Sequence, residues 1–193
     1  LEMRRKIVQA AQRLFQANGY QASTVAEICI EADVAYKTFF NHFPSKHQVL
    51  LEVEAESLES VLNHLGEVLE IEGSTSHRIT TFFERIAVEA EAAGPMNREL
   101  LAEMIHSAHT RGDEPDQIKR IVAAIERIVE AGVAQGDVRT DVAVGTLADL
   151  IRGNYYVLMI SFGNLADYAI VAQARSLASL VAESLAARGS PHS

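Results

Sequence analysis

Residues 24–46 read TVAEICIEADVAYKTFFNHFPSK, and this stretch decides the fold of the first part of the chain. It holds two short helical patterns with a break between them. Thr24 and Glu27 form T-x-x-E, the capping box that begins many helices. Asp33 stands at the break, where a residue that tolerates left-handed backbone is useful, and Pro44 ends the second pattern. We therefore predict two short helices joined by a tight turn.

Helices are also predicted on both sides of this stretch. Over residues 4–18, apolar side chains recur at helical spacing, and Gly19 follows where a left-handed residue commonly ends a helix. Ser45 and Gln48 form a second capping box, S-x-x-Q, for a helix that reaches about residue 70. The first 50 residues thus predict a helix-turn-helix with a supporting helix before it.

The side chains of the two short helices divide into an inner set and an outer set. The inner set would form a small core around Phe15, Ile28, Phe39 and Phe43. On the outer face, the groups that could reach base edges in a major groove are Tyr36, Lys37 and Asn41. The flanking groups that could anchor phosphates are Thr24, Thr38, His42 and Lys46. This division predicts double-stranded DNA as a partner.

The remainder of the chain reads as longer amphipathic helices. We place them at about 75–93, 96–109, 115–135, 141–163 and 167–187, with a glycine followed by Pro, Asp or Asn at each break. No alternating strand pattern of any length is present. The predicted fold class is therefore all-α.

Composition and charge fit this division. The 193 residues are 48% hydrophobic and 22% charged, which is enough apolar material for one or two globular domains. The net charge is −9. Residues 1–50 hold 6 Lys and Arg against 4 Asp and Glu, a net +2, whereas residues 51–193 hold 11 against 22, a net −11. A mildly basic head on an acidic body favours DNA contact through the head alone.

Several other classes of protein find little support. Cys29 is the only cysteine, which argues against disulfides and multi-Cys zinc sites and fits a reducing, cytoplasmic setting. No apolar run is long enough to cross a membrane, and the charged start does not resemble a signal peptide. Nucleophile-elbow, phosphate-loop and H-E-x-x-H motifs are absent, so we predict neither an enzyme nor a cofactor. A metal site at His106 and His109, with His77 nearby, is a weaker alternative, because no acidic or Cys ligand accompanies them.

The first 50 residues resemble the DNA-binding domain of TetR-type transcriptional repressors. The resemblance rests on A-x-x-L-F-x-x-x-G-Y at residues 11–20, T-V-x-x-I at 24–28 and T-F-F-x-H-F-x-x-K at 38–46. The chain departs from the family at three positions. Asp33 replaces the usual turn glycine, Ala35 replaces a serine that opens the second helix, and Phe40 replaces a tyrosine whose hydroxyl often binds phosphate. These departures predict a set of phosphate contacts that differs from the family's average.

The resemblance implies a three-part chain. Residues 1–47 would form the helix-turn-helix domain, residues 48–188 a helical domain for effector binding and dimerisation, and residues 189–193 a flexible tail. It also implies a repressor that binds a palindromic operator as a homodimer and is released by a small, mostly apolar effector.

The body supplies candidate residues for both implied roles. Suitable linings for an effector cavity are Phe82, Phe83, Ile86, Met104, Ile105, Ile125, Ile128, Asn154, Tyr155 and Met159. Apolar and small residues of the last two helices suit a four-helix dimer interface, namely Leu147, Ile151, Leu158, Ile170, Ala174, Leu177, Ala178 and Val181. Both sets could instead be ordinary core of a single chain. The competing readings of the whole protein are a helical protein–protein interaction module and a non-regulatory DNA-binding protein.

Overall fold

The computed structural model describes residues 2–94, 96, 100, 116–165 and 167–187. Over these residues the regular structure is entirely helical, apart from one isolated antiparallel bridge between Val138 and Ala186. The predicted all-α class is confirmed. None of the helices in this part of the chain combines the length and the apolar character that crossing a membrane requires.

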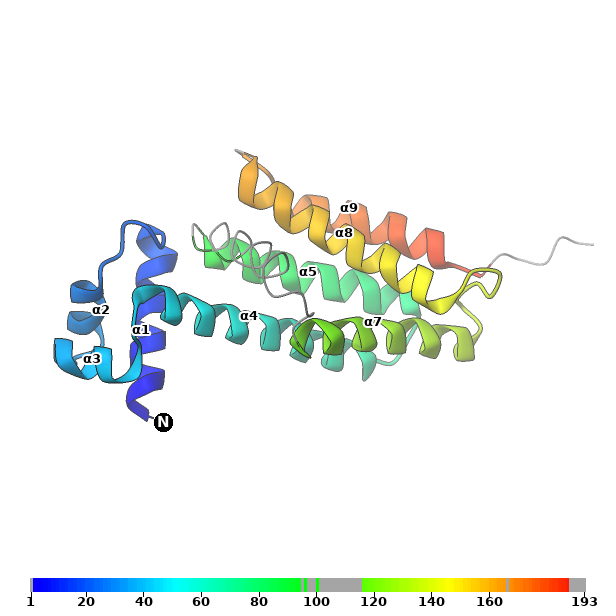
Figure 1. The fold of residues 1–193 in the computed structure, drawn as a ribbon. Helices are drawn as coiled ribbons and strands as arrows, with labels where there is room; N and C mark the ends of the chain where they lie inside the picture. Colours follow the sequence, from blue (N-terminus) through cyan, green and yellow to red (C-terminus); the bar gives the residue numbers. More distant parts are fainter. Residues whose placement is uncertain (1, 95, 97–99, 101–115, 166, 188–193) are drawn as a thin grey trace, which may run out of the picture. The chain divides into compact units, whose positions relative to one another are not determined.

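Four helices occupy the first third of the chain (Figure 1). They are α1 (Glu2–Asn18), α2 (Val25–Glu31), α3 (Tyr36–His42) and α4 (Lys46–Leu69). The bounds agree with the predicted helices to within two residues. The predicted helix-turn-helix therefore corresponds to α2, the turn after it, and α3.

The capping and turn residues act as the sequence predicts. Thr24 Oγ1 accepts a hydrogen bond from the Glu27 N–H at 3.2 Å, and the Glu27 carboxylate accepts one from the Thr24 N–H at 2.7 Å. Gly19 and Asp33 both have left-handed backbone, with φ of 81° and 52°. Asp33 thus adopts the left-handed backbone of the turn, which glycine would adopt without steric cost.

The core of the N-terminal part is aromatic. Phe15, Phe39 and Phe43 are fully buried together with Ile28, as predicted. The first turns of α4 join the same core, through Val49, Leu50 and Val53. The first compact unit therefore extends to Glu59, and helix α4 contributes residues to both compact units.

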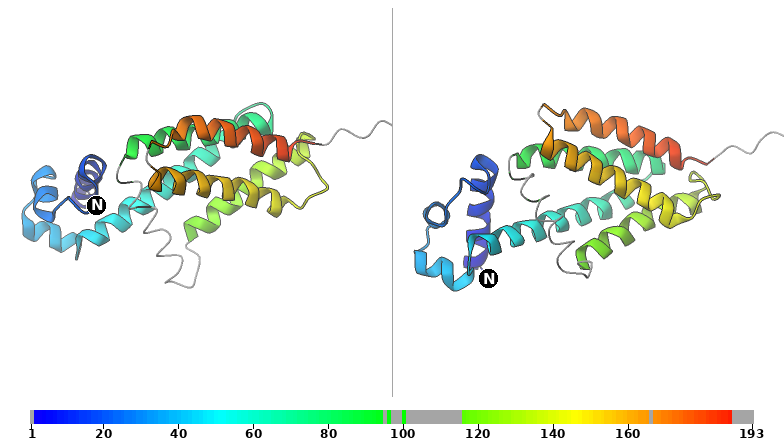
Figure 2. Two further views of the ribbon diagram at one scale, coloured as in Figure 1. Left: turned by 90° about the horizontal axis from the view of Figure 1, so that it is seen from above. Right: turned by 45° about the horizontal axis from the view of Figure 1, so that its top comes forward.

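The second compact unit contains the later part of α4 and most of α5 (Thr75–Ala93), followed by α7 (Asp116–Gln135), α8 (Val144–Asn164) and α9 (Ile170–Leu185). Helix α8 packs against both α7 and α9, and the three run side by side in both views of Figure 2. The helix predicted over 96–109 lies outside the described residues, except for Met96 and Leu100, as does the predicted tail over 189–193. The Met96 and Leu100 side chains are buried in the core of the first unit.

A buried junction joins the start of α5 to the end of α7. The Asp137 carboxylate accepts from the Thr75 N–H at 2.6 Å and from the Thr75 hydroxyl at 2.8 Å. Gly132 lies against this pair, and a Cβ there would overlap Thr75 Oγ1 and Val138 Cγ2. The absence of a side chain at residue 132 is therefore a packing requirement.

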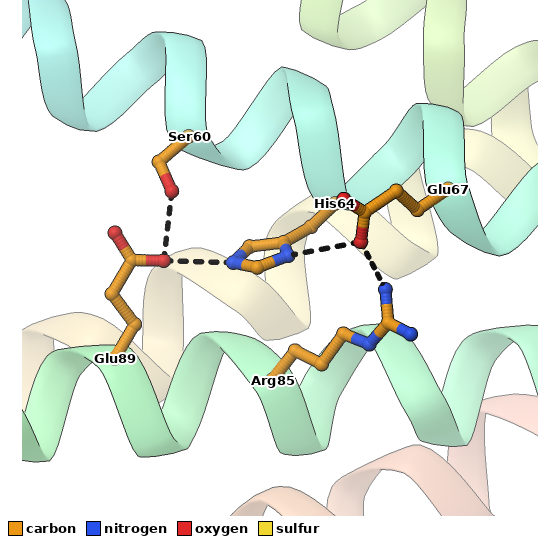
Figure 3. A network of polar contacts seen from close by, with 5 residues as sticks. All are labelled: Ser60, His64, Glu67, Arg85 and Glu89. Atoms are coloured by element: carbon orange, nitrogen blue, oxygen red, sulfur yellow. Dashed lines mark hydrogen bonds and ion pairs between the residues drawn. The ribbon is translucent and has the colours of Figure 1, made fainter.

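A polar network joins α4 to α5 within the second unit (Figure 3). The Glu89 carboxylate accepts from the Ser60 hydroxyl at 2.9 Å and lies 2.8 Å from His64 Nε2. On the other side of the imidazole, Glu67 lies 3.9 Å from His64 Nδ1 and pairs with Arg85. Because Nδ1 is buried and has no hydrogen-bond partner among the described residues, the network holds His64 mainly through Glu89.

Candidate nucleic-acid interface

Helix α3 presents a polar and aromatic face to solvent. Tyr36, Lys37 and Asn41 are all exposed, and Tyr36 keeps 57% of its surface. Phe39 on the opposite side is fully buried and fixes the helix to the core. The three groups predicted to reach base edges therefore lie on the free side of a short, well-anchored helix.

Phe40 adds an apolar component to this face that the sequence pattern did not assign to it. The residue is 44% exposed, and its ring lies 5.0 Å from the Tyr36 ring, centroid to centroid. The comparison with the family marks Phe40 only as a position without the usual hydroxyl. The signal available was its place one turn after Tyr36, because residues four apart share a helix face.

The flanking candidates are less uniform. Thr38 and His42 are half-buried. Thr24 is exposed, but its hydroxyl takes part in the capping box, donating to Glu27 Oε2 at 2.8 Å as well as accepting from the Glu27 N–H. The capping bond with Thr24 also lowers the pKa of Glu27. The Thr24 hydroxyl therefore already caps α2, and a contact with phosphate would have to use the same hydroxyl.

Lys46 is directed into the protein rather than toward solvent. Its Nζ donates to the Tyr20 carbonyl at 2.7 Å and to the Ser23 carbonyl at 2.8 Å, and it lies 4.1 Å from the centre of the Tyr20 ring. Burial lowers the pKa of Lys46, and the negative charge of Glu27 opposes that effect. This geometry makes Lys46 a clamp between the start of α4 and the segment before α2. Sequence spacing could not show that two backbone carbonyls converge on Lys46, and its contact with phosphate stays a prediction.

Most of the residues predicted to line an effector cavity lie in the interior of the second unit. Phe82, Ile86, Ile125, Ile128 and Met159 are buried, and Phe83 is fully so. The rings of Phe82 and Tyr155 lie 6.2 Å apart, so α5 and α8 meet there. Burial raises the pKa of Tyr155, with Tyr156 and Glu89 adding to the effect, so its phenol remains a protonated donor.

Three members of that set stand apart. The Asn154 amide donates to the Leu150 carbonyl of its own helix at 2.8 Å. Met104 and Ile105 lie outside the described residues, as do His106 and His109 of the alternative metal site. The described part of the chain contains no group of three His, Cys, Asp or Glu side chains arranged to hold a metal ion.

The dimer interface stays a prediction, and the structure places most of the residues predicted for it in the interior of the single chain. Seven of the eight are buried inside the single chain, where α8 and α9 pack on their neighbours; these are Leu147, Ile151, Leu158, Ile170, Ala174, Ala178 and Val181. Leu177 is half-buried. The large apolar residues that α8 leaves exposed are Leu150, Val157 and Ile160, and on α9 the corresponding residue is Leu180. Helix α8 is apolar on two faces, and the sequence pattern did not show which one the chain covers itself.

Known proteins share both the sequence of the N-terminal part and the fold of the chain. Residues 7–53 match the family model of the bacterial regulatory proteins of the tetR family. The HTH-type transcriptional repressor KstR2 of Mycolicibacterium smegmatis is 25% identical over 160 residues, covering 80% of this chain and 76% of the repressor.

Solved structures agree with that sequence match. PfmR of Thermus thermophilus, a TetR family regulator, has a TM-score of 0.69 at 21% identity over 92% of this chain and 97% of its own. FadR of Thermus thermophilus, a TetR family repressor solved in complex with lauroyl-CoA, has a TM-score of 0.64 at 21% identity over 98% of both chains. The family match identifies residues 7–53 as a DNA-binding domain of the tetR type, and the chain shares the fold of TetR family regulators.

Proposed function

We propose that the protein is a transcriptional repressor that binds a palindromic operator as a homodimer and is released by a small, mostly apolar effector. The observation that carries the proposal is the free face of α3. Tyr36, Lys37 and Asn41 project from a helix whose other side is locked to a core by Phe39. A short helix held in this way can enter a major groove without losing its own packing.

The side chains of this face suit direct reading of bases. An asparagine amide can pair with both polar groups of an adenine edge, and a lysine can donate to the acceptors of guanine. The exposed Phe40 ring offers an apolar contact for a thymine methyl group. The half-buried Thr38 and His42 remain candidates for phosphate contacts, with Thr24 at the start of α2.

Selection from random double-stranded DNA tests this assignment. The full-length protein should enrich a palindrome with two half-sites, and its affinity for that palindrome should fall steeply as salt rises. Specific binding should exceed binding to unrelated DNA by roughly a thousandfold or more. Enrichment of no sequence, or equal binding to all sequences, would contradict the proposal and favour a non-regulatory DNA-binding protein.

Dimerisation is proposed through the outer faces of α8 and α9. Leu150, Val157 and Ile160 are exposed on α8, and Leu180 is 61% exposed on α9. Gly153 lies among these α8 residues, and a Cβ there would meet no atom of the described chain within 4 Å apart from its neighbours and the nearby backbone of its own helix. A second copy of the chain would cover these apolar groups and approach closely at the glycine.

Charge substitutions on this face test the dimer. Val157→Glu combined with Leu180→Glu should convert the protein to a monomer at micromolar concentration in analytical ultracentrifugation. Val88→Glu on α5 is the matched control, because Val88 is exposed to the same degree as Val157, 57% against 56%, but belongs to another helix. A parent protein that sediments as a monomer would remove the dimer from the proposal.

An apolar effector is supported by the interior of the second unit and by one structural neighbour. The buried groups around Phe82, Tyr155 and Met159 combine aromatic and flexible apolar surface with one protonated phenol. FadR of Thermus thermophilus holds lauroyl-CoA, whose acyl chain is apolar. A ligand that binds the DNA-incompetent state more tightly would shift the population away from DNA.

Thermal-shift screening with fatty acids, acyl thioesters and small aromatic compounds tests the effector class. A compound that raises the melting temperature of the parent should lower its affinity for the selected palindrome. Phe82→Leu and Met159→Leu should reduce that shift, whereas Val88→Ala, on the surface of α5, should not. A compound that tightens operator binding would contradict the repressor–inducer scheme.

A further inference from the structure

Arg4 joins three helices of the first compact unit. It lies near the start of α1, yet its Nη1 donates to the His42 carbonyl at 3.0 Å, and its Nη2 pairs with Glu52 Oε1 on α4. The face of the guanidinium lies 4.3 Å from the centre of the Phe43 ring. One side chain therefore holds the end of α3 to both α1 and α4.

The site of the Nη1 contact matters for the reading helix. His42 is the last residue of α3, and the carbonyls of a final helical turn lack partners within the helix. A cation placed there satisfies a carbonyl and interacts favourably with the negative end of the helix. Phe43, which the guanidinium covers, is fully buried and anchors the same end of α3 in the core. The contacts of Arg4 therefore fix the C-terminal end of α3, one residue beyond Asn41.

The guanidinium is occupied within the protein. Both terminal nitrogens donate internally and one face covers an aromatic ring, so Arg4 is held by three contacts at once, a geometry that a lysine could not reproduce. The Arg4 and Glu52 side chains are each only about one third exposed, at 36% and 37%. Such an arginine is suited to orienting a helix rather than to contacting phosphate.

We propose that Arg4 is a positioning residue for DNA reading: with Glu52 as its anchor, it sets the orientation of α3 without itself contacting DNA. This inference rests on the proposed DNA-binding function. It differs from a direct contact between Arg4 and phosphate in one respect, because it assigns the acidic residue Glu52 a role in binding DNA, which is itself negatively charged.

The decisive variant is Glu52→Gln. Removing a negative charge near DNA should tighten binding if only the overall field matters. The positioning role predicts the opposite, a loss of roughly tenfold in affinity for the selected palindrome, comparable to one charge-assisted hydrogen bond. Glu56→Gln is the matched control, because it removes the same charge one helical turn further along α4. Glu56 lines one surface hollow together with Arg4 and Glu52. It should bind no more weakly than the parent.

Arg4→Lys separates positioning from phosphate contact, since it keeps the charge and removes the planar fork. It should also lose about tenfold in specific affinity while non-specific affinity and the slope of log K against log salt stay unchanged. The slope of Arg4→Ala gives the second readout, because each lost phosphate contact lowers its magnitude by about 0.9.

The outcomes are distinct. Weaker specific binding by Glu52→Gln and Arg4→Lys, with an unchanged salt slope and folded circular dichroism spectra, supports the inference. A reduced slope for Arg4→Ala makes Arg4 a phosphate contact and overturns it. Parent-like binding by both Glu52→Gln and Arg4→Lys also overturns it. Failure of the parent to select any DNA sequence would instead overturn the proposed function, so the two failures can be told apart.

Discussion

Two basic side chains stabilise the helix-turn-helix from inside the protein. Lys46 and Arg4 are both cations near the helix-turn-helix, and both direct donors to backbone carbonyls inside the protein. The exposed face of α3 carries Tyr36, Lys37 and Asn41, with Phe40 beside Tyr36. Arg4 and Lys46 thus stabilise the first unit from inside, whereas Lys37 is exposed on α3.

Thr24 gives the first prediction at this scale. Thr24→Ala removes both side-chain bonds of the capping box and should lower the free energy of unfolding by about 1 kcal/mol. Thr24→Ser keeps the hydroxyl and is the control, with stability close to that of the parent. Urea denaturation measures both variants. Equal stability of the alanine and serine variants would show that the cap contributes nothing.

Glu56 gives a prediction about pH. Burial, with the negative charge of Glu52 adding to it, raises the pKa of Glu56 above its usual 4.5. The folded state then binds more protons than the unfolded state, so the Glu56 contribution to stability falls as pH rises through the window above 4.5. Glu56→Gln cannot ionise and escapes this loss.

Denaturation of the two proteins at pH 4 and pH 7 tests the effect. Relative to the parent, Glu56→Gln should gain stability on going from pH 4 to pH 7. A stability difference that does not change with pH would show that the ionisation of Glu56 is not coupled to folding.

At the scale of elements, most helices were predictable because their signals are local. The signals for α2 and α3 depend only on neighbouring residues, namely the capping box at Thr24, the left-handed backbone of Asp33 and the helix end at Pro44. Both helices lie where these signals predict them. Helix α8 begins three residues later than predicted. Asp141 stands at the predicted start of this helix, and its carboxylate accepts two hydrogen bonds from Arg139. The helix itself begins at Val144.

Other parts of the site depend on tertiary contacts and could not be read from the sequence. The partners of Arg4 lie 38 and 48 residues away, and no spacing rule connects them. Helix α8 carries apolar residues on two faces, so periodicity alone could not separate core positions from surface positions. Ile151 is buried in the core, whereas Val157 is exposed. Only the structure therefore shows which apolar residues of α8 are exposed.

The junction between α5 and α7 gives a prediction at this scale. Gly132→Ala would place a methyl group into Thr75 Oγ1 and Val138, and overpacking of this kind should destabilise the protein by about 1–3 kcal/mol. Gly66→Ala on α4 is the control, because its Cβ would meet no atom of the described chain within 4 Å apart from its neighbours and the nearby backbone of its own helix. It should stabilise the protein by up to roughly 1 kcal/mol. Thermal unfolding that ranks both variants alike would contradict the account of this junction.

On the scale of the whole molecule, the chain forms two compact units, and helix α4 contributes residues to both. The charge of the sequence follows the same division, net +2 over residues 1–50 and net −11 over residues 51–193. An acidic body disfavours contact with DNA except through the head. A dimer formed through α8 and α9 would present two such heads to one operator, which raises affinity through effective concentration.

The central claim is that α3 reads DNA, and one measurement tests it most directly. The affinity of the double variant Lys37→Ala and Asn41→Ala for the selected palindrome should be compared with that of the parent at the same salt concentration. Loss of two base contacts predicts a fall of roughly 2–6 kcal/mol in binding free energy, with an unchanged melting temperature because both side chains are exposed. Binding as tight as that of the parent would contradict the assignment of α3 as the reading helix.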